Sequence, residues 1–186
     1  MLFYSGAAGA ERIFNILDTK PTIKESDSAP DLNIKKGNIE FKGVSFAYPK
    51  TIAQAINNIN ISIEGGSTAA LVGHSGAGKS TIINLLPRFY DPIEGQVYID
   101  EQNISNVTLH SLRKSISLVS QDIILFDDTV RANVAYANMK ASDEEIQKAC
   151  DFSASSEFIQ DLPQSYETII GENGVRLSGG QKQRIS

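Results

Sequence analysis

The sequence predicts an α/β fold with three parts: a parallel sheet that carries a phosphate-binding loop, an antiparallel β-subdomain and a helical subdomain. Three observations lead to this prediction. A glycine-rich loop joins a short apolar run to a helical pattern. Several segments in the first half alternate between apolar and polar residues. After about residue 129 the pattern becomes helical.

The glycine-rich loop fits the pattern G-x-x-x-x-G-K-[ST]. Glycine lets successive backbone N–H groups point toward an anion, Lys79 is expected to place its cation on the β- and γ-phosphates, and the Ser80 hydroxyl is expected to ligate Mg²⁺. The alternative is a turn that happens to hold a lysine, and the strand–loop–helix context argues against it. The residues expected to bind the nucleotide are Gly73, His74, Ser75, Gly76, Ala77, Gly78, Lys79, Ser80 and Thr81.

The expected strands are of two kinds. Residues 68–72 and 115–119 are continuous apolar runs, which are typical of buried parallel strands. Alternation predicts antiparallel strands at residues 39–42, 44–48, 59–63 and 96–100. Helices are expected at residues 5–18, 81–86, 109–113 and 155–162, and a capping box (Ser142 and Glu145) opens another.

Composition narrows the class of protein. The 186 residues suit one globular domain, and the net charge of −5 disfavours a general nucleic-acid binder. The single cysteine, Cys150, is expected to be a buried residue, and His74 and His110 form no ligand cluster, so we expect no metal site made of protein ligands alone. No apolar run is long enough to span a membrane, and the first residues do not resemble a signal peptide.

A second motif lies near the end of the chain, at residues 177–181. Ser178 and Gln181 are spaced as the N-cap and N3 residues of a capping box. Because Gly179 and Gly180 begin the helix, its N–H groups are expected to form a second anion site.

The two motifs together, in this order, resemble the nucleotide-binding domain of ABC transporters, with a P-loop NTPase core. Residues 177–181 match the signature motif of that family. Gln121, expected at the end of a strand, resembles the glutamine that reaches Mg²⁺ and the attacking water. Tyr48 resembles the aromatic residue that stacks on adenine.

The exporter branch of the family fits best. Residues 1–18 resemble the end of an exporter's last membrane helix, 19–36 have the composition of a linker, and 37–186 form the nucleotide-binding domain. Glu172 resembles the glutamate that contacts the coupling helices. Residues 172–174 and 119–121 are similar to lipid A flippases, and multidrug and peptide exporters are nearly as close.

The resemblance implies an ATPase motor that uses ATP and Mg²⁺ to drive export or flipping of a lipid or amphipathic substrate. It implies a transmembrane domain and a second nucleotide-binding domain, bound head to tail, as partners, with no role for nucleic acid. The residues expected to contact ATP in trans are Ser178, Gly179, Gly180 and Gln181. The implied location is the cytoplasmic face of a bacterial inner membrane.

The family's Walker B strand and catalytic glutamate do not occur in this sequence. We therefore expect an incomplete ABC ATPase fold that is marginally stable and has little ATPase activity alone. Two alternatives stay open: a non-catalytic ATP-binding remnant, and a soluble ABC-type ATPase that acts on nucleic acid or ribosomes. The acidic composition disfavours the second. The sequence does not identify the cargo.

Overall fold

The computed structural model describes residues 2–49, 51, 53–120 and 122–186, with side chains from residue 10 onward. The chain divides into two compact units, residues 1–117 and 118–186, and each is described by itself. Unit 1 holds α1 (Leu2–Leu17), β1 (Ile39–Phe46), β2 (Ile56–Ile63), α2 (Lys79–Leu85), β3 (Glu94–Ile99), β4 (Gln102–Asn103), η1 (Ile104–Asn106) and α3 (Leu109–Lys114).

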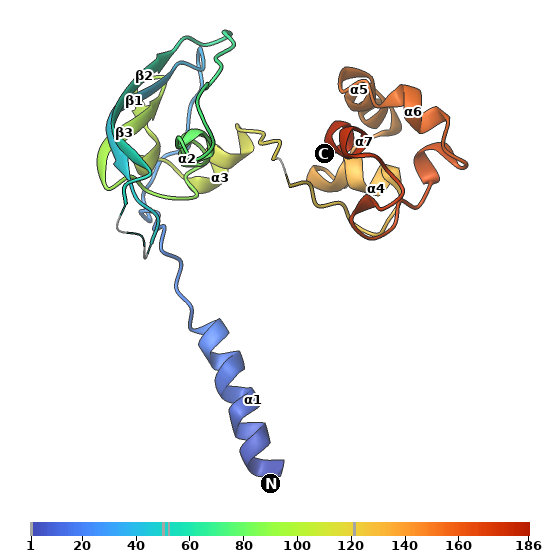
Figure 1. Cartoon of the computed structure of the whole chain (residues 1–186), viewed down its shortest axis with the longest axis horizontal. Helices are drawn as coiled ribbons and strands as arrows, with labels where there is room; N and C mark the ends of the chain where they lie inside the picture. The colour runs from blue at the N-terminus through green and yellow to red at the C-terminus, as the bar shows by residue number, and fades with distance from the viewer. Residues whose placement is uncertain (1, 50, 52, 121) are drawn as a thin grey trace. The chain divides into compact units, whose positions relative to one another are not determined.

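Unit 1 is built on an antiparallel sheet with the strand order β2-β1-β3-β4. The register places Ile39 opposite Ile63 on one side and Ile99 on the other. Helices α2 and α3 lie on one face of the sheet (Figure 1). The core between them is apolar and consists of Leu32, Phe41, Val44, Phe46, Ile56, Leu85, Val97, Ile99, Ile104, Val107 and Leu112.

The antiparallel part of the prediction is confirmed, because the alternating segments form β1, β2 and β3. The prediction of buried strands at residues 68–72 and 115–119 is wrong, because neither segment is a strand in the part of the chain that the structure describes. Every described strand pair is antiparallel. A strand needs neighbouring strands to satisfy its backbone groups, and none of the described strands pairs with either segment. Val72 is accordingly 93% exposed.

Unit 2 is helical. It contains α4 (Val130–Val134), η2 (Ala135–Ala137), α5 (Asp143–Phe152), α6 (Ser156–Gln160), η3 (Ser165–Glu167), η4 (Glu172–Gly174) and α7 (Gly179–Ile185). The predicted capping box at Ser142 and Glu145 is confirmed. The apolar core, which includes the buried Cys150, consists of Leu125, Val130, Ile146, Cys150, Phe158, Ile159, Ile170, Leu177 and Ile185.

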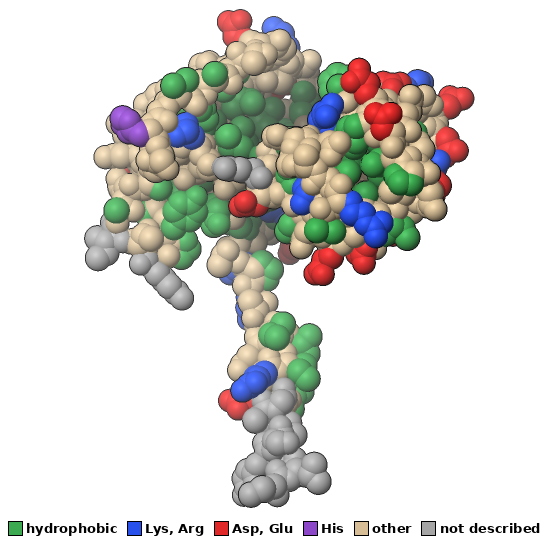
Figure 2. Space-filling model, turned by 45° about the vertical axis from the view of Figure 1, so that its right-hand side comes forward, with side chains coloured by type: hydrophobic (Ala, Val, Ile, Leu, Met, Phe, Trp, Pro, Cys, Tyr) green, Lys and Arg blue, Asp and Glu red, His purple; other side chains and the backbone are tan. Residues whose placement is uncertain are grey.

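Helix α1 confirms the predicted N-terminal helix, which begins three residues earlier than expected. Apolar side chains gather along one side of its described part (Figure 2). These residues are exposed: Ile13, Phe14, Ile16 and Leu17. No helix in the described ranges combines the length and the apolar character needed to cross a bilayer.

Candidate nucleotide-binding site

The predicted phosphate loop leads directly into α2. Gly78 is the N-cap of this helix and adopts a left-handed conformation with φ of 84°. A Cβ atom at this position would lie 2.7 Å from the carbonyl oxygen of Ala55. The position therefore requires glycine for two reasons, its backbone conformation and its close approach to the residue before β2.

Lys79, the first residue of α2, folds back over the loop. Its Nζ donates hydrogen bonds to the carbonyl oxygens of Gly73 at 2.9 Å and His74 at 2.7 Å. The ammonium group is thus held beside the loop and near the positive end of α2. A cation and a helix N-terminus side by side favour an anionic ligand.

The next two residues of α2 have different surroundings. Ser80 is exposed, whereas Thr81 is only 5% exposed. A serine hydroxyl is an oxygen ligand of the kind that Mg²⁺ prefers, and its exposure beside Lys79 fits a metal ion shared with bound phosphates. Such an ion would neutralise phosphate charge, while Lys79 and the loop orient the phosphates.

Tyr48 follows β1 and reaches the same helix. Its hydroxyl lies 3.0 Å from the hydroxyl of Thr81. Its ring makes edge-type contacts with Phe46 and Tyr90, at centroid distances of 5.0 and 5.3 Å. The structure therefore brings the residue predicted to stack on adenine together with the end of the phosphate loop.

The second motif lies in unit 2 and confirms the predicted capping box. The backbone N–H of Ser178 donates to Oε1 of Gln181 at 2.8 Å, and the N–H of Gln181 donates to Oγ of Ser178 at 3.3 Å. Gly179 and Gly180 are exposed, with open space where a side chain would be. Gln181 thus uses its side chain to cap the helix, while the two glycines leave the helix end accessible.

Two other residues were predicted to belong to the site, Glu172 and Gln121. Glu172 is exposed at the start of η4, and its role in coupling remains a prediction. Gln121 lies outside the described residues.

Sequence reasoning missed a cavity of about 750 Å³ in unit 2. Its lining combines the aromatic side chains of Phe126 and Tyr136 with Arg131, whose guanidinium pairs with Asp143 and Glu167. Periodicity does not reveal such a cavity, because its walls come from several short segments: the loop before α4, α4 itself, η2, the loop after η2 and the start of α5.

Comparison with known proteins gives a consistent result. The family model described as ABC transporter matches residues 56–186. The chain is 47% identical over 181 residues to the ATP-dependent lipid A-core flippase of Syntrophus aciditrophicus (strain SB), covering 97% of this chain and 30% of that protein. It is 48% identical over 174 residues to a protein of Staphylococcus aureus (strain NCTC 8325 / PS 47) that is named as a multidrug export ATP-binding/permease protein. This match covers 94% of this chain and 30% of that protein.

A solved structure of a bacterial Atm1-family ABC exporter with ATP bound matches with a TM-score of 0.91 and 41% identity, covering 98% of this chain and 32% of that chain. The chain thus spans about a third of the length of the relatives it matches. The predicted resemblance is confirmed: the family model covers well over half of the chain, and this chain belongs to the ABC transporter family.

Proposed function

We propose that this chain is the ATP-binding part of an ABC exporter subunit. The observation that carries the proposal is the arrangement at α2, where Lys79 is held over the glycine loop and Thr81 is bonded to Tyr48. The relatives support it: the names of two describe a flippase and an export protein, and the third is an exporter with ATP bound. For this chain alone the proposal is restricted to ATP binding, and hydrolysis is proposed for the whole protein.

In the bound state, the loop N–H groups and Lys79 would hold the β- and γ-phosphates, Ser80 would ligate Mg²⁺, and Tyr48 would stack on adenine. Gln121 would reach Mg²⁺ and the attacking water. The signature residues Ser178, Gly179, Gly180 and Gln181 would contact an ATP molecule held by a second nucleotide-binding domain, in a head-to-tail dimer. Closure of that dimer would depend on the γ-phosphate, because a ligand shifts an equilibrium only through its differential affinity.

The proposed setting is the cytoplasmic face of a bacterial membrane, beside the transmembrane domain of the exporter. Glu172 would contact that domain. Two relatives of similar identity, 47% and 48%, are named for different cargoes, lipid A-core and drugs. We therefore propose only a class of cargo, namely lipids or amphipathic molecules.

Titration calorimetry with Mg·ATP tests the proposal on the full chain. Lys79→Ala removes the cation beside the loop, and we expect it to weaken binding by about 10- to 100-fold, as the loss of a charged hydrogen bond predicts. The matched control is Lys148→Ala, which removes an exposed lysine from α5. Equal binding by both variants would contradict the proposal.

A further inference from the structure

Arg88 lies three residues after α2 and is almost completely buried, with 4% of its surface exposed. Its backbone is left-handed, with φ of 53°, which is unusual for a residue other than glycine. Such a conformation persists only where surrounding contacts enforce it. The contacts of the Arg88 side chain should therefore explain its left-handed backbone.

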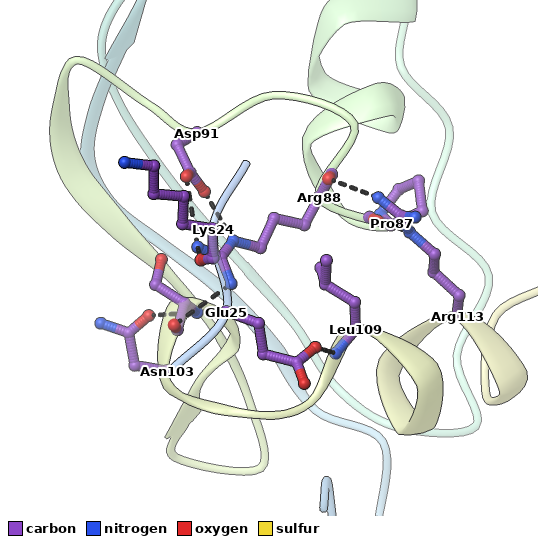
Figure 3. A network of polar contacts seen from close by, with 9 residues as sticks. Lys24, Glu25, Pro87, Arg88, Asp91, Asn103, Leu109 and Arg113 are labelled. Atoms are coloured by element: carbon purple, nitrogen blue, oxygen red, sulfur yellow. Dashed lines mark hydrogen bonds and ion pairs between the residues drawn. The ribbon is translucent and has the colours of Figure 1, made fainter. Parts of the chain in front are cut away.

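The guanidinium of Arg88 joins three separate segments (Figure 3). It donates to both carboxylate oxygens of Asp91, from Nε at 2.7 Å and from Nη2 at 3.2 Å. It also donates to the carbonyl oxygen of Ser105 in η1 at 3.2 Å and to that of Lys24 at 3.0 Å. A fork of donors can hold these partners at once, and the single nitrogen of a lysine cannot reproduce that geometry.

A second arginine fixes the backbone from which Arg88 extends. Arg113, in α3, donates to the carbonyl oxygen of Pro87 at 3.1 Å and to that of Arg88 at 3.0 Å. The N–H of Arg88 also donates to the carbonyl of Leu85, the last residue of α2. The end of α2 is thus connected to Lys24 through one buried residue, Arg88.

Lys24 begins a segment without regular structure, residues 24–38, which we call the strap. The strap is attached to the rest of unit 1 along its length. Glu25 accepts a hydrogen bond from the N–H of Leu109, the N–H of Leu32 donates to Oγ of Ser111 at 2.8 Å, and the Leu32 side chain is buried in the core. At its far end the carboxylate of Asp100 accepts four backbone N–H groups, those of residues 35–38.

We propose that Arg88 is a positioning residue that couples nucleotide occupancy of residues 73–81 to the strap, and through the strap to the chain leading from α1. The inference rests on the proposed function and adds a connection to it. Because the guanidinium is buried, releasing one partner would leave a buried donor unpaired, which is costly. A change in the position or rigidity of α2 is therefore passed on to Lys24.

Hydrogen–deuterium exchange on the full chain, with and without Mg·ATP, tests the coupling. Amide protons in the strap are measurable because Leu32, Asn33 and residues 35–38 have acceptors. If ATP binds only while the strap is closed, bound ATP opposes the opening that lets these amides exchange. ATP at about 10 times its dissociation constant should then slow their exchange by up to about tenfold. We expect Arg88→Lys to lose this slowing while residues 73–81 are still protected by ATP.

The control is Arg184→Lys, which removes an arginine that donates to the carbonyl of Ala154 in unit 2 and should leave the effect on the strap intact. If Arg88→Lys does not fold, Asp91→Asn carries the same test, because it removes the carboxylate that orients the guanidinium. If ATP still slows amide exchange in the strap of Arg88→Lys, or of Asp91→Asn where that variant replaces it, the inference is overturned. Protection of residues 73–81 without any change in the strap of the native chain would also overturn it, with ATP binding intact. No protection at residues 73–81 would overturn both the proposed function and the inference.

Discussion

The hydroxyl groups of Tyr48 and Thr81 lie 3.0 Å apart, so the residue predicted to contact adenine is bonded to the helix that follows the phosphate loop. Thr81 is buried and Tyr48 is half-buried, so this hydrogen bond is partly shielded from water. The base-binding and phosphate-binding parts of the proposed site are therefore in direct contact, although 33 residues separate them in the sequence.

Substitutions at Tyr48 should separate the roles of its hydroxyl and its ring. Tyr48→Phe removes the partner of the buried Thr81 hydroxyl, and we expect a loss of about 1 kcal/mol in unfolding free energy with ATP binding retained. Tyr48→Ala also removes the stacking surface, and we expect ATP binding to weaken by about 1–3 kcal/mol. Urea unfolding and calorimetry measure the two effects. Equal ATP affinity in the two variants would show that the ring does not contact the base.

Gly78→Ala should disrupt the phosphate loop. A Cβ atom would lie 2.7 Å from the Ala55 carbonyl oxygen, and φ of 84° is strained for alanine. We expect a loss of about 1–3 kcal/mol in stability, together with weaker ATP binding. Gly180→Ala is the control for stability alone, because no atom lies within 4 Å of its added Cβ. A melting temperature equal to that of the native chain would contradict this account of Gly78.

Much of the antiparallel sheet was predictable, because alternation in residues 39–42, 44–48 and 59–63 indicates a sheet with one buried face, and these segments fall largely within β1 and β2. The run at residues 68–72 shows where this reasoning stops. An apolar run predicts a buried strand only where neighbouring strands cover it, and Val72 is exposed here. Leu71 instead lines an apolar groove of about 400 Å³ beside α2.

The site was predictable where one motif defines it, as for residues 73–81 and the capping box of Ser178 and Gln181. Contacts between distant residues were not. Residues 19–36 have the lysine, proline and serine content of a linker. Composition alone therefore did not reveal that Leu32 is buried, or that Asp100 accepts hydrogen bonds from the N–H groups of Lys35 and Lys36.

Glu101→Gly should stabilise the chain. Asp100 and Glu101 form the turn between β3 and β4 with φ of 46° and 66°, a conformation that suits asparagine, aspartate and glycine better than glutamate. Replacing Glu101 by glycine removes backbone strain, which should raise the unfolding free energy by about 1 kcal/mol. Glycine also increases the conformational entropy of the unfolded chain, and this offsets part of the gain. Glu101→Ala is the control, since it removes the side chain and keeps the strain. A gain of the same size from both variants would contradict the explanation.

Asp100 should make stability depend on pH. Hydrogen bonds from the backbone N–H groups of Gly37 and Lys36, with those of Asn38 and Lys35, hold the pKa of its carboxyl group well below the usual range. A depressed pKa in the folded state contributes stability above the unfolded pKa of about 3.9, and this contribution is lost as pH falls toward the folded value.

Asp100→Asn removes this titration and weakens the attachment of the strap. The urea midpoint of the native chain should therefore exceed that of Asp100→Asn most at neutral pH, and the gap should narrow below about pH 4. Urea titrations at several pH values between 7 and 3 measure it. A gap that stays constant through this range would show that the charge of Asp100 contributes nothing to stability, and that the four N–H groups are held by the shape of the turn alone.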